Sequence, residues 1–136
     1  MSKRKQNVLL GVGTLLLGTI LYILFRKTTY VSIIFQNIRW VNSISNSLEC
    51  IDNDFIKYYL PDFLWALSLC CGFQVIYTPG IKGNVICGVV AVVFGGVWEI
   101  LQHAKIVSGT GDFVDVLMYL LAGTICVILN LKERDK

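Results

Sequence analysis

Four long runs of apolar residues dominate this chain and leave few folds open to it. They cover residues 8–25, 58–77, 85–101 and 113–131, and the first run contains no charged residue. A helix needs about 20 mostly apolar residues, and at least about 17, to cross the hydrocarbon core of a bilayer, so all four runs are long enough. Transmembrane strands are disfavoured, because a barrel needs many alternating segments of about 10 residues. The runs therefore predict four transmembrane helices.

The composition excludes the ordinary soluble classes of protein. Hydrophobic residues make up 55% of the 136 residues and charged residues only 15%, whereas a typical soluble domain has about 25% charged residues. Such a chain is also too apolar to remain disordered. The predicted fold class is all-α, a single polytopic membrane domain over residues 1–136, with the lipid bilayer as its main partner and no nucleic-acid partner.

Lysine and arginine residues predict how the chain is oriented. Basic residues favour the cytoplasmic side of a membrane, and a cytoplasmic N-terminus places seven of them inside and five outside. The first run is longer than the apolar core of a signal peptide, about 7–15 residues, so we expect it to be retained. We predict a multi-pass membrane protein with both termini in the cytoplasm. The inner residues are Lys3, Arg4, Lys5, Lys82, Lys132, Arg134 and Lys136, and the outer ones are Arg26, Lys27, Arg39, Lys57 and Lys105.

Residues 28–48 differ from the four runs, because their apolar side chains recur every three or four positions. This period predicts an amphipathic helix. Two arrangements are open to it: it lies along the membrane surface with Tyr30 and Trp40 as interfacial anchors, or it packs on the loops as a soluble helix. The apolar positions are Val31, Ile34, Phe35, Ile38, Val41, Ile44 and Leu48.

Small residues four apart occur in three of the runs. Close packing of helices in lipid favours such pairs, and they fit contacts inside one bundle and in a homo-oligomer equally well. The five cysteines contain no C-x-x-C pair, so we expect apolar packing from them and predict no cofactor. The small pairs are Thr14 with Gly18, Ser68 with Gly72, and Ala91 with Gly95.

Polar side chains from three separate runs are predicted to meet at one level of the membrane. One carboxylate opens the second run, one closes the third and two open the fourth. Antiparallel neighbours bring these ends to the same side, the outer one under the predicted orientation. An ionisable group in a membrane span is expensive and so indicates a function. The predicted polar cluster consists of Asp62, Glu99, Gln102, His103, Asp112 and Asp115, with Trp65, Trp98 and Tyr119 as flanking aromatic residues.

The polar cluster has a functional and a structural interpretation. If its helical faces meet, the site could bind a polar headgroup, a glycan or a cation, or handle a proton. In the structural interpretation, Asp62, Asp112 and Asp115 only cap first helical turns, with Asp112 as the N-cap of the fourth span. The spacing of Glu99 and His103 is not a recognised zinc pattern, so we predict no metal centre.

Two short motifs in the second half of the chain resemble those of a known family. Glu99 and Gln102 form an E-x-x-Q stretch, and Asp112 and Asp115 form D-x-x-D at the start of the last span. With the D-F-L-W sequence at residues 62–65, these motifs resemble the VanZ-like family over residues 58–131. Members usually carry asparagine where Tyr119 stands. The resemblance implies a bacterial plasma-membrane protein of the cell envelope, in a family of which some members are linked to teicoplanin resistance.

Three functions follow from these patterns. The first is a cell-envelope membrane protein whose polar cluster binds or processes a polar lipid headgroup, glycan or cation. The second is a small proton- or cation-coupled transporter that uses Glu99 or Asp115 as its coupling carboxylate. The third is a structural assembly partner whose acids only cap helices. No motif of a soluble enzyme is present, so the sequence specifies no soluble-enzyme mechanism and leaves open whether the protein is an enzyme.

Overall fold

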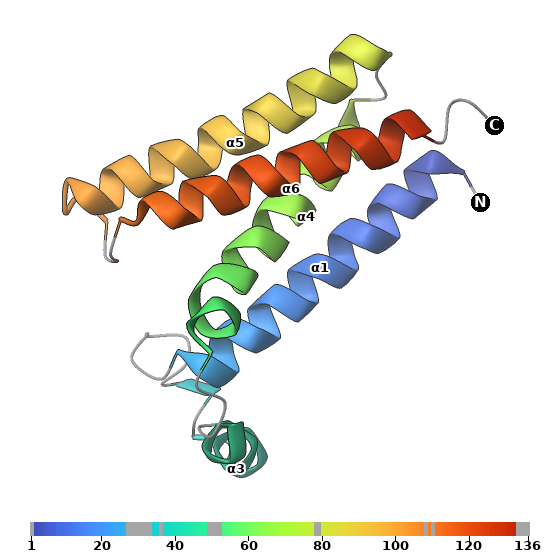
Figure 1. The fold of residues 1–136 in the computed structure, drawn as a ribbon. Coiled ribbons are helices and arrows are strands. Elements are labelled where there is room, and N and C mark those ends of the chain that lie inside the picture. Colours follow the sequence, from blue (N-terminus) through green and yellow to red (C-terminus); the bar gives the residue numbers. More distant parts are fainter. Residues whose placement is uncertain are drawn as a thin grey trace.

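The computed structural model describes residues 2–26, 34–35, 37–48, 53–77, 80–107, 109 and 111–132. In these ranges all regular structure is helical and no strand is present. Four helices are long and apolar enough to cross a membrane, which confirms the number predicted. In chain order (Figure 1), the helices are α1 (Lys3–Phe25), α3 (Arg39–Leu48), η1 (Phe55–Tyr59), α4 (Leu60–Ile76), α5 (Ile81–His103) and α6 (Phe113–Lys132).

The helices extend beyond the apolar runs that predicted them. α1 begins five residues before residue 8, because Ser2 accepts a hydrogen bond from the backbone N–H of Lys5 at 3.4 Å and caps the helix. α5 gains about one turn at its start and two residues at its end. An apolar run marks the part of a helix that hydrocarbon can cover, whereas the backbone ladder continues through polar residues until a cap or glycine ends it.

A single π-helical turn, η1, precedes α4. Pro61 has no N–H, and the N–H of Leu60 bonds to the carbonyl of Phe55, five residues back. Asn53 caps this start by accepting from the N–H of Phe55 at 3.0 Å. Asp62 occupies the first turn of α4 as predicted, next to Pro61, but the chain is already helical before it, and no side-chain cap is formed at the helix start. The carboxylate of Asp62 is therefore available for another contact.

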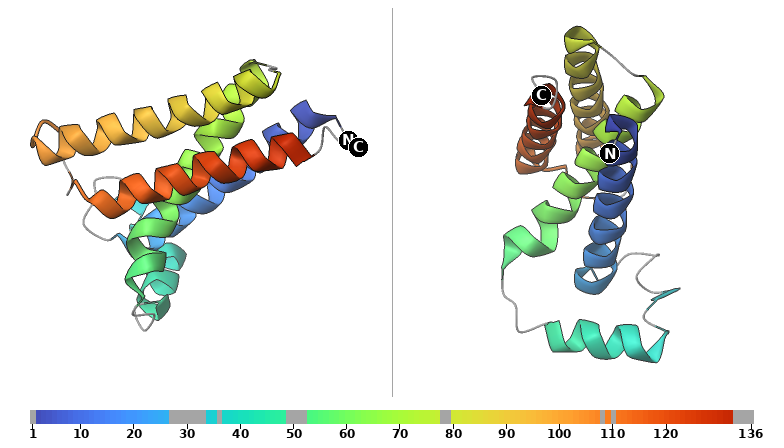
Figure 2. Two further views of the ribbon diagram at one scale, coloured as in Figure 1. Left: turned by 45° about the horizontal axis from the view of Figure 1, so that its top comes forward. Right: turned by 90° about the vertical axis from the view of Figure 1, so that its right-hand side faces the viewer.

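The four long helices form two antiparallel pairs, α1 with α4 and α5 with α6. α4 is central, because it contacts both members of the other pair as well as α1. Figures 1 and 2 show the two pairs close together near the chain termini and diverging toward the end where α5 connects to α6. The diverging end also holds the end of α1 and the start of α4. All the predicted carboxylates belong to this end of the bundle.

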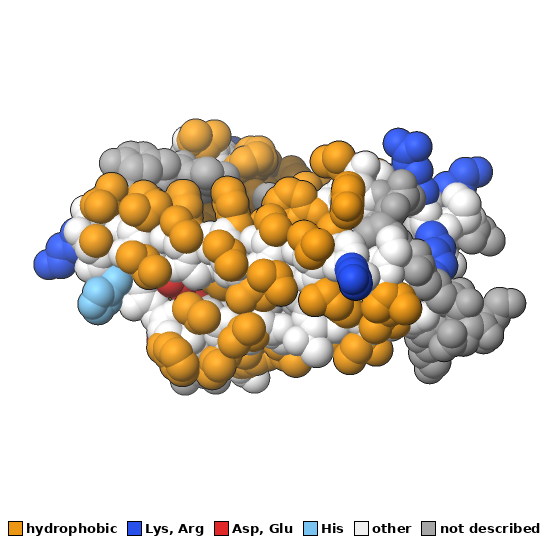
Figure 3. All heavy atoms as spheres, turned by 90° about the horizontal axis from the view of Figure 1, so that it is seen from above, with side chains coloured by type: hydrophobic (Ala, Val, Ile, Leu, Met, Phe, Trp, Pro, Cys, Tyr) orange, Lys and Arg blue, Asp and Glu red, His pale blue; other side chains and the backbone are white. Residues whose placement is uncertain are grey.

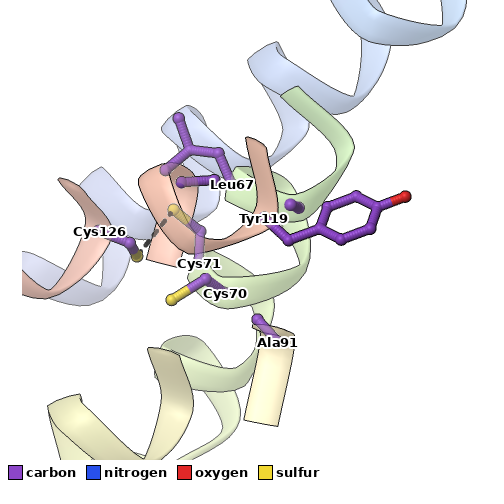
Figure 4. Close-up of a cluster of buried hydrophobic side chains, with 8 residues drawn as sticks. Leu67, Cys70, Cys71, Ala91, Tyr119 and Cys126 are labelled. Atoms are coloured by element: carbon purple, nitrogen blue, oxygen red, sulfur yellow. Dashed lines mark hydrogen bonds between the residues drawn. The ribbon is translucent and has the colours of Figure 1, made fainter. Parts of the chain in front are cut away.

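Small side chains fill the interior where the pairs meet (Figure 4). The Sγ atoms of Cys71 and Cys126 lie 3.8 Å apart, and the four described cysteines are buried free thiols, in line with the predicted packing role. Cys50 lies outside the described residues. The buried core consists of Ala66, Leu67, Cys70, Cys71, Ala91, Tyr119, Ala122 and Cys126.

Small residues let the helices approach within this one chain. A Cβ on Gly18 would lie 2.9 Å from the ring of Trp65, and a Cβ on Gly88 would lie 3.3 Å from the carbonyl oxygen of Gly123. These positions bring α1 onto α4 and α5 onto α6. Gly72, by contrast, has open space where a side chain would go. A homo-oligomer remains a prediction.

α3 confirms the amphipathic helix for residues 39–48. It buries Val41 and Ser45, and the Ser45 hydroxyl donates to the carbonyl of Leu24 at 2.7 Å, which ties α3 to the end of α1. Trp40 is 66% exposed, as an interfacial anchor would be. Residues 28–33 and 36, which include Tyr30 and Val31, lie outside the described residues, and contact with a membrane surface stays a prediction.

Two adjacent glycines of α5 provide a test of this packing. A Cβ on Gly95 would overlap the ring of Tyr119, whereas a Cβ on Gly96 would meet nothing within 4 Å. We expect Gly95→Ala to lower the free energy of unfolding by about 1–3 kcal/mol through overpacking. Gly96→Ala should not lower it, since alanine is the better helix former. Circular dichroism during unfolding in mixed micelles measures both, and equal effects would contradict the packing of α6 on α5.

Candidate functional site

Glu99 is the centre of the polar residues at the diverging end. It lies one turn before the end of α5 and is only 6% exposed. Its Oε1 accepts a hydrogen bond from the Tyr119 hydroxyl at 2.8 Å, and its Oε2 accepts one from the backbone N–H of Asp112 at 3.1 Å. One carboxylate thus binds both the start of α6 and a side chain two turns into it. In Figure 4 the Tyr119 hydroxyl points away from the cysteine core, as this bond requires.

The connection between α5 and α6 brings Asp112 to Glu99. A Cβ on Gly111 would lie 2.7 Å from the carbonyl oxygen of Glu99, so only glycine allows this approach. Gly109 has a φ of 143°, a conformation that glycine adopts without strain. Glycine at both positions explains how the short loop folds back onto the end of α5. Thr110 lies outside the described residues.

Asp112 has the capping role predicted for it. Its Oδ1 accepts from the N–H of Val114 at 3.1 Å, which caps α6. Its Oδ2 accepts from the hydroxyl of Tyr59 in η1 at 3.3 Å. The structural interpretation is therefore correct for this residue, and the second bond adds a link from the α6 cap to the start of α4.

Asp62 forms an ion pair with Arg26, the residue that ends α1. The Asp62 Oδ2 and Arg26 Nη2 atoms lie 3.6 Å apart, and the two side chains are 13% and 29% exposed. The guanidinium also lies over the rings of Tyr22 and Tyr58, with centroid distances of 5.1 and 5.6 Å. The Arg26 Nε is buried and has no hydrogen-bond partner among the described residues. Asp62 is thus paired with Arg26, while the Nε of Arg26 remains a donor without a partner in the described ranges.

Asp115 is the least satisfied of the carboxylates. It is 7% exposed, and its Oδ1 is buried without a hydrogen-bond partner in the described part of the chain. Asp62, Glu99 and Asp112 lie near enough for their charges to act on Asp115, as does the charge of Arg26. A buried acceptor without a donor destabilises a protein by about 1–3 kcal/mol. Asp115 is therefore the position at which a bound donor would gain most.

Gln102 and His103 sit at the edge of this arrangement. The Gln102 side chain packs against Gly109, which closes the loop. His103 ends α5 and is exposed. No group of three or more histidine, cysteine, aspartate and glutamate residues in the described ranges could hold a metal ion. The four carboxylates that do gather are Asp62, Glu99, Asp112 and Asp115.

A groove of about 370 Å³ opens where the helix pairs diverge, and of the four carboxylates Asp62 lines it. Its predicted flanking aromatics are all present: Trp65 from α4, Trp98 from α5 and Tyr119 from α6. The Trp65 indole N–H donates to Thr19 Oγ1 at 3.3 Å and its ring packs against the Tyr22 ring in a tilted arrangement, so it is held in place. Figure 3 shows a mostly apolar face in which acidic atoms are visible only in a recess. The lining residues are Leu15, Asp62, Trp65, Ala66, Leu69, Ala91, Phe94, Gly95, Trp98 and Tyr119.

Sequence reasoning missed a second set of buried polar residues at the opposite end. The Asn7 amide donates to Gln74 Oε1 at 3.3 Å and to Asn130 Oδ1 at 3.1 Å, joining α1, α4 and α6. Lys3 adds a bond to the carbonyl of Asn130 at 3.2 Å. The signal was present, because three amides stand within or beside apolar runs, where polar side chains form bonds between helices. We refer to Asn7, Gln74 and Asn130 as the amide cluster.

Sequence reasoning placed Arg26 at the end of the first helix and among the outer basic residues, but gave it no carboxylate partner, and it did not single out Tyr59. Both contact carboxylates of the predicted cluster. Comparison with protein-family models, with curated proteins and with solved structures finds no match to this chain. The site is therefore interpreted from its own geometry.

The bond between Tyr119 and Glu99 gives a direct prediction. Tyr119→Phe removes the hydroxyl and leaves one oxygen of a buried carboxylate without its donor, so the free energy of unfolding should fall by about 1–3 kcal/mol. Tyr77→Phe is the matched control, because Tyr77 is 60% exposed at the end of α4, and its effect should stay within about 0.5 kcal/mol. Unfolding in mixed micelles measures both changes. If the two variants unfold alike, the Tyr119 hydroxyl does not hold α6 to Glu99.

Proposed function

We propose that this chain is a VanZ-like multi-pass protein of the bacterial plasma membrane that binds a polar headgroup of a cell-envelope molecule at its acidic end. Four helices of membrane-spanning length support the membrane assignment. Lys3, Arg4, Lys5 and Lys82 belong to the end opposite the carboxylates, and the preference of basic residues for the cytoplasm puts the acidic end outside. The E-x-x-Q and D-x-x-D residues of the motifs meet at that end, which fits a shared role.

The observation that carries the proposal is the buried Oδ1 of Asp115. Among the described residues, Arg26 forms an ion pair with Asp62, and the buried Oδ1 of Asp115 has no hydrogen-bond donor. Burying a polar group without a hydrogen bond destabilises a protein. A ligand that donates hydrogen bonds, such as an ammonium or a hydroxyl group, would supply this donor. Helix capping explains Asp112 and the ion pair with Arg26 explains Asp62, but neither gives the Asp115 Oδ1 a partner in the described ranges.

Binding at one end fits the structure better than transport through it. The carboxylates and the amide cluster lie at opposite ends of the bundle. Between them stands a tightly packed apolar core that includes four residues without exposed surface: Cys70, Cys71, Ala122 and Cys126. A coupled transporter usually holds its site near the midplane, between half-helices. The proposed site instead opens sideways at one end.

Soluble headgroup analogues test the proposal. In a Trp40→Phe background, the remaining tryptophans, Trp65 and Trp98, line the groove, so their fluorescence reports binding. We expect ethanolamine to give a saturable change and choline, whose nitrogen has no N–H, to bind at least tenfold more weakly. Asp115→Asn should weaken ethanolamine binding at least tenfold, because the amide removes both the charge and one acceptor.

The control for this variant is Asp54→Asn. Asp54 is an exposed carboxylate at the start of η1, so the same change in net charge occurs outside the set of Asp62, Glu99, Asp112 and Asp115, and ethanolamine affinity should stay within twofold of wild type. Absence of saturable binding by ethanolamine, or equal affinities of the Asp115→Asn and wild-type proteins, would refute the proposal. Proton flux in proteoliposomes that Glu99→Gln abolishes would instead favour a transporter.

A further inference from the structure

The groove beside the carboxylates is built for an amphipathic molecule. Leu15, Leu69 and Phe94 give it apolar walls from three helices, and its charged lining residue is Asp62. Its volume of about 370 Å³ falls within the range of small-molecule sites, about 300–1,000 Å³. A free sugar or a small cation would use the carboxylates but leave these walls without a purpose. An alkyl chain attached to a polar headgroup would use both.

The groove is open to the side of the bundle. Leu15 is 48% exposed, Phe94 is 61% exposed and Trp98 is 45% exposed, although all three line it. In a membrane such surfaces face lipid, so an occupant can enter from the bilayer without crossing water. We therefore expect the molecule that occupies this groove to be a lipid.

Two unused polar atoms of opposite kind mark where the headgroup would lie. The Arg26 Nε is a buried donor and the Asp115 Oδ1 is a buried acceptor, each without a partner in the described ranges. Asp62 connects them, because it pairs with Arg26, lines the groove and acts through its charge on Asp115. Tyr119, which also lines the groove, follows Asp115 by one turn on the same face of α6. A zwitterion with an anionic and a hydrogen-bond-donating end matches this pair of atoms.

We infer that the groove binds a phospholipid whose headgroup carries a primary ammonium, with one acyl chain between α1 and α5, its phosphate at Arg26 and its ammonium at Asp62 and Asp115. The inference rests on the proposed function and names the class of its ligand. An arginine suits phosphate because its planar donors match the oxygens. A carboxylate bonds to a primary ammonium through charge-assisted hydrogen bonds, which a quaternary ammonium cannot form.

Lipid retention on the purified full chain tests the inference. After delipidation, the protein is incubated with phosphatidylethanolamine, phosphatidylcholine or phosphatidylglycerol of the same acyl chains, and native mass spectrometry counts the bound lipid. We expect phosphatidylethanolamine to be retained at least tenfold more than the other two. Equal retention of all three lipids would show general annular lipid only and would overturn the inference. A preference for phosphatidylglycerol would also overturn it, because the site would then recognise a hydroxyl headgroup and not an ammonium.

A pair of variants on α1 tests whether the acyl chain of the lipid lies in the groove. Leu15→Trp fills the groove and should lower retention of phosphatidylethanolamine at least tenfold. Leu16→Trp is the matched control, because Leu16 is 58% exposed and does not line the groove, and it should retain the lipid as wild type does. Binding of soluble ethanolamine distinguishes failure of the lipid site in the groove from failure of headgroup binding. If Leu15→Trp retains both ethanolamine and the lipid at wild-type levels, the lipid site in the groove is refuted while headgroup binding stands.

A measurement that leaves Leu15 unchanged guards against misfolding of Leu15→Trp. The variant Trp40→Phe/Trp98→Phe keeps Trp65 as its single tryptophan, since the chain has three. Phosphatidylethanolamine with brominated acyl chains should quench Trp65, and unbrominated phosphatidylethanolamine should reverse the quenching at a concentration at least tenfold lower than phosphatidylcholine does. Equal reversal by both lipids would overturn the inference.

Discussion

The position of α6 depends on one buried carboxylate, that of Glu99. Its two oxygens accept from the Tyr119 hydroxyl and the Asp112 N–H, so a single side chain on α5 fixes both the start of α6 and its rotation about its own axis. Apolar surfaces in lipid give little preference for one rotation, because neighbouring helices and lipid tails are equally apolar. Hydrogen bonds supply that preference here. The same rotation carries Asp115 inward, into the charges of the other carboxylates.

The bundle combines two polar ends with a tight interior. The amide cluster joins α1, α4 and α6 where the helix pairs converge, and close glycine contacts such as Gly88 on Gly123 hold the pairs themselves. At the other end the pairs diverge, and the space between them becomes a groove. Rigid packing at one end and an open, charged groove at the other are what a binding site at a membrane surface requires.

Much of the fold was predictable because four apolar runs of the required length determine four helices. The meeting of Glu99 with Asp112 was predictable too, because a short loop joins the ends of antiparallel helices. The pair of Arg26 and Asp62 was not, since it depends on the side on which α1 packs, and a helix that is apolar all round carries no periodic signal of its buried face. For the same reason Tyr119 was predicted only as a flanking aromatic residue, not as the donor to Glu99.

The central claim is that the Oδ1 of Asp115 has no partner among the described residues because its partner is the headgroup of a ligand. Solid-state NMR tests this most directly, on protein with ¹³C-labelled aspartate in bilayers of ¹⁵N-labelled phosphatidylethanolamine. The Asp115 carboxyl signal is identified by its loss in Asp115→Asn. We predict a dipolar coupling that places the headgroup nitrogen within about 3–4 Å of that carboxyl carbon, as a charge-assisted hydrogen bond requires. An Asp115 signal without coupling to the headgroup nitrogen would contradict the account.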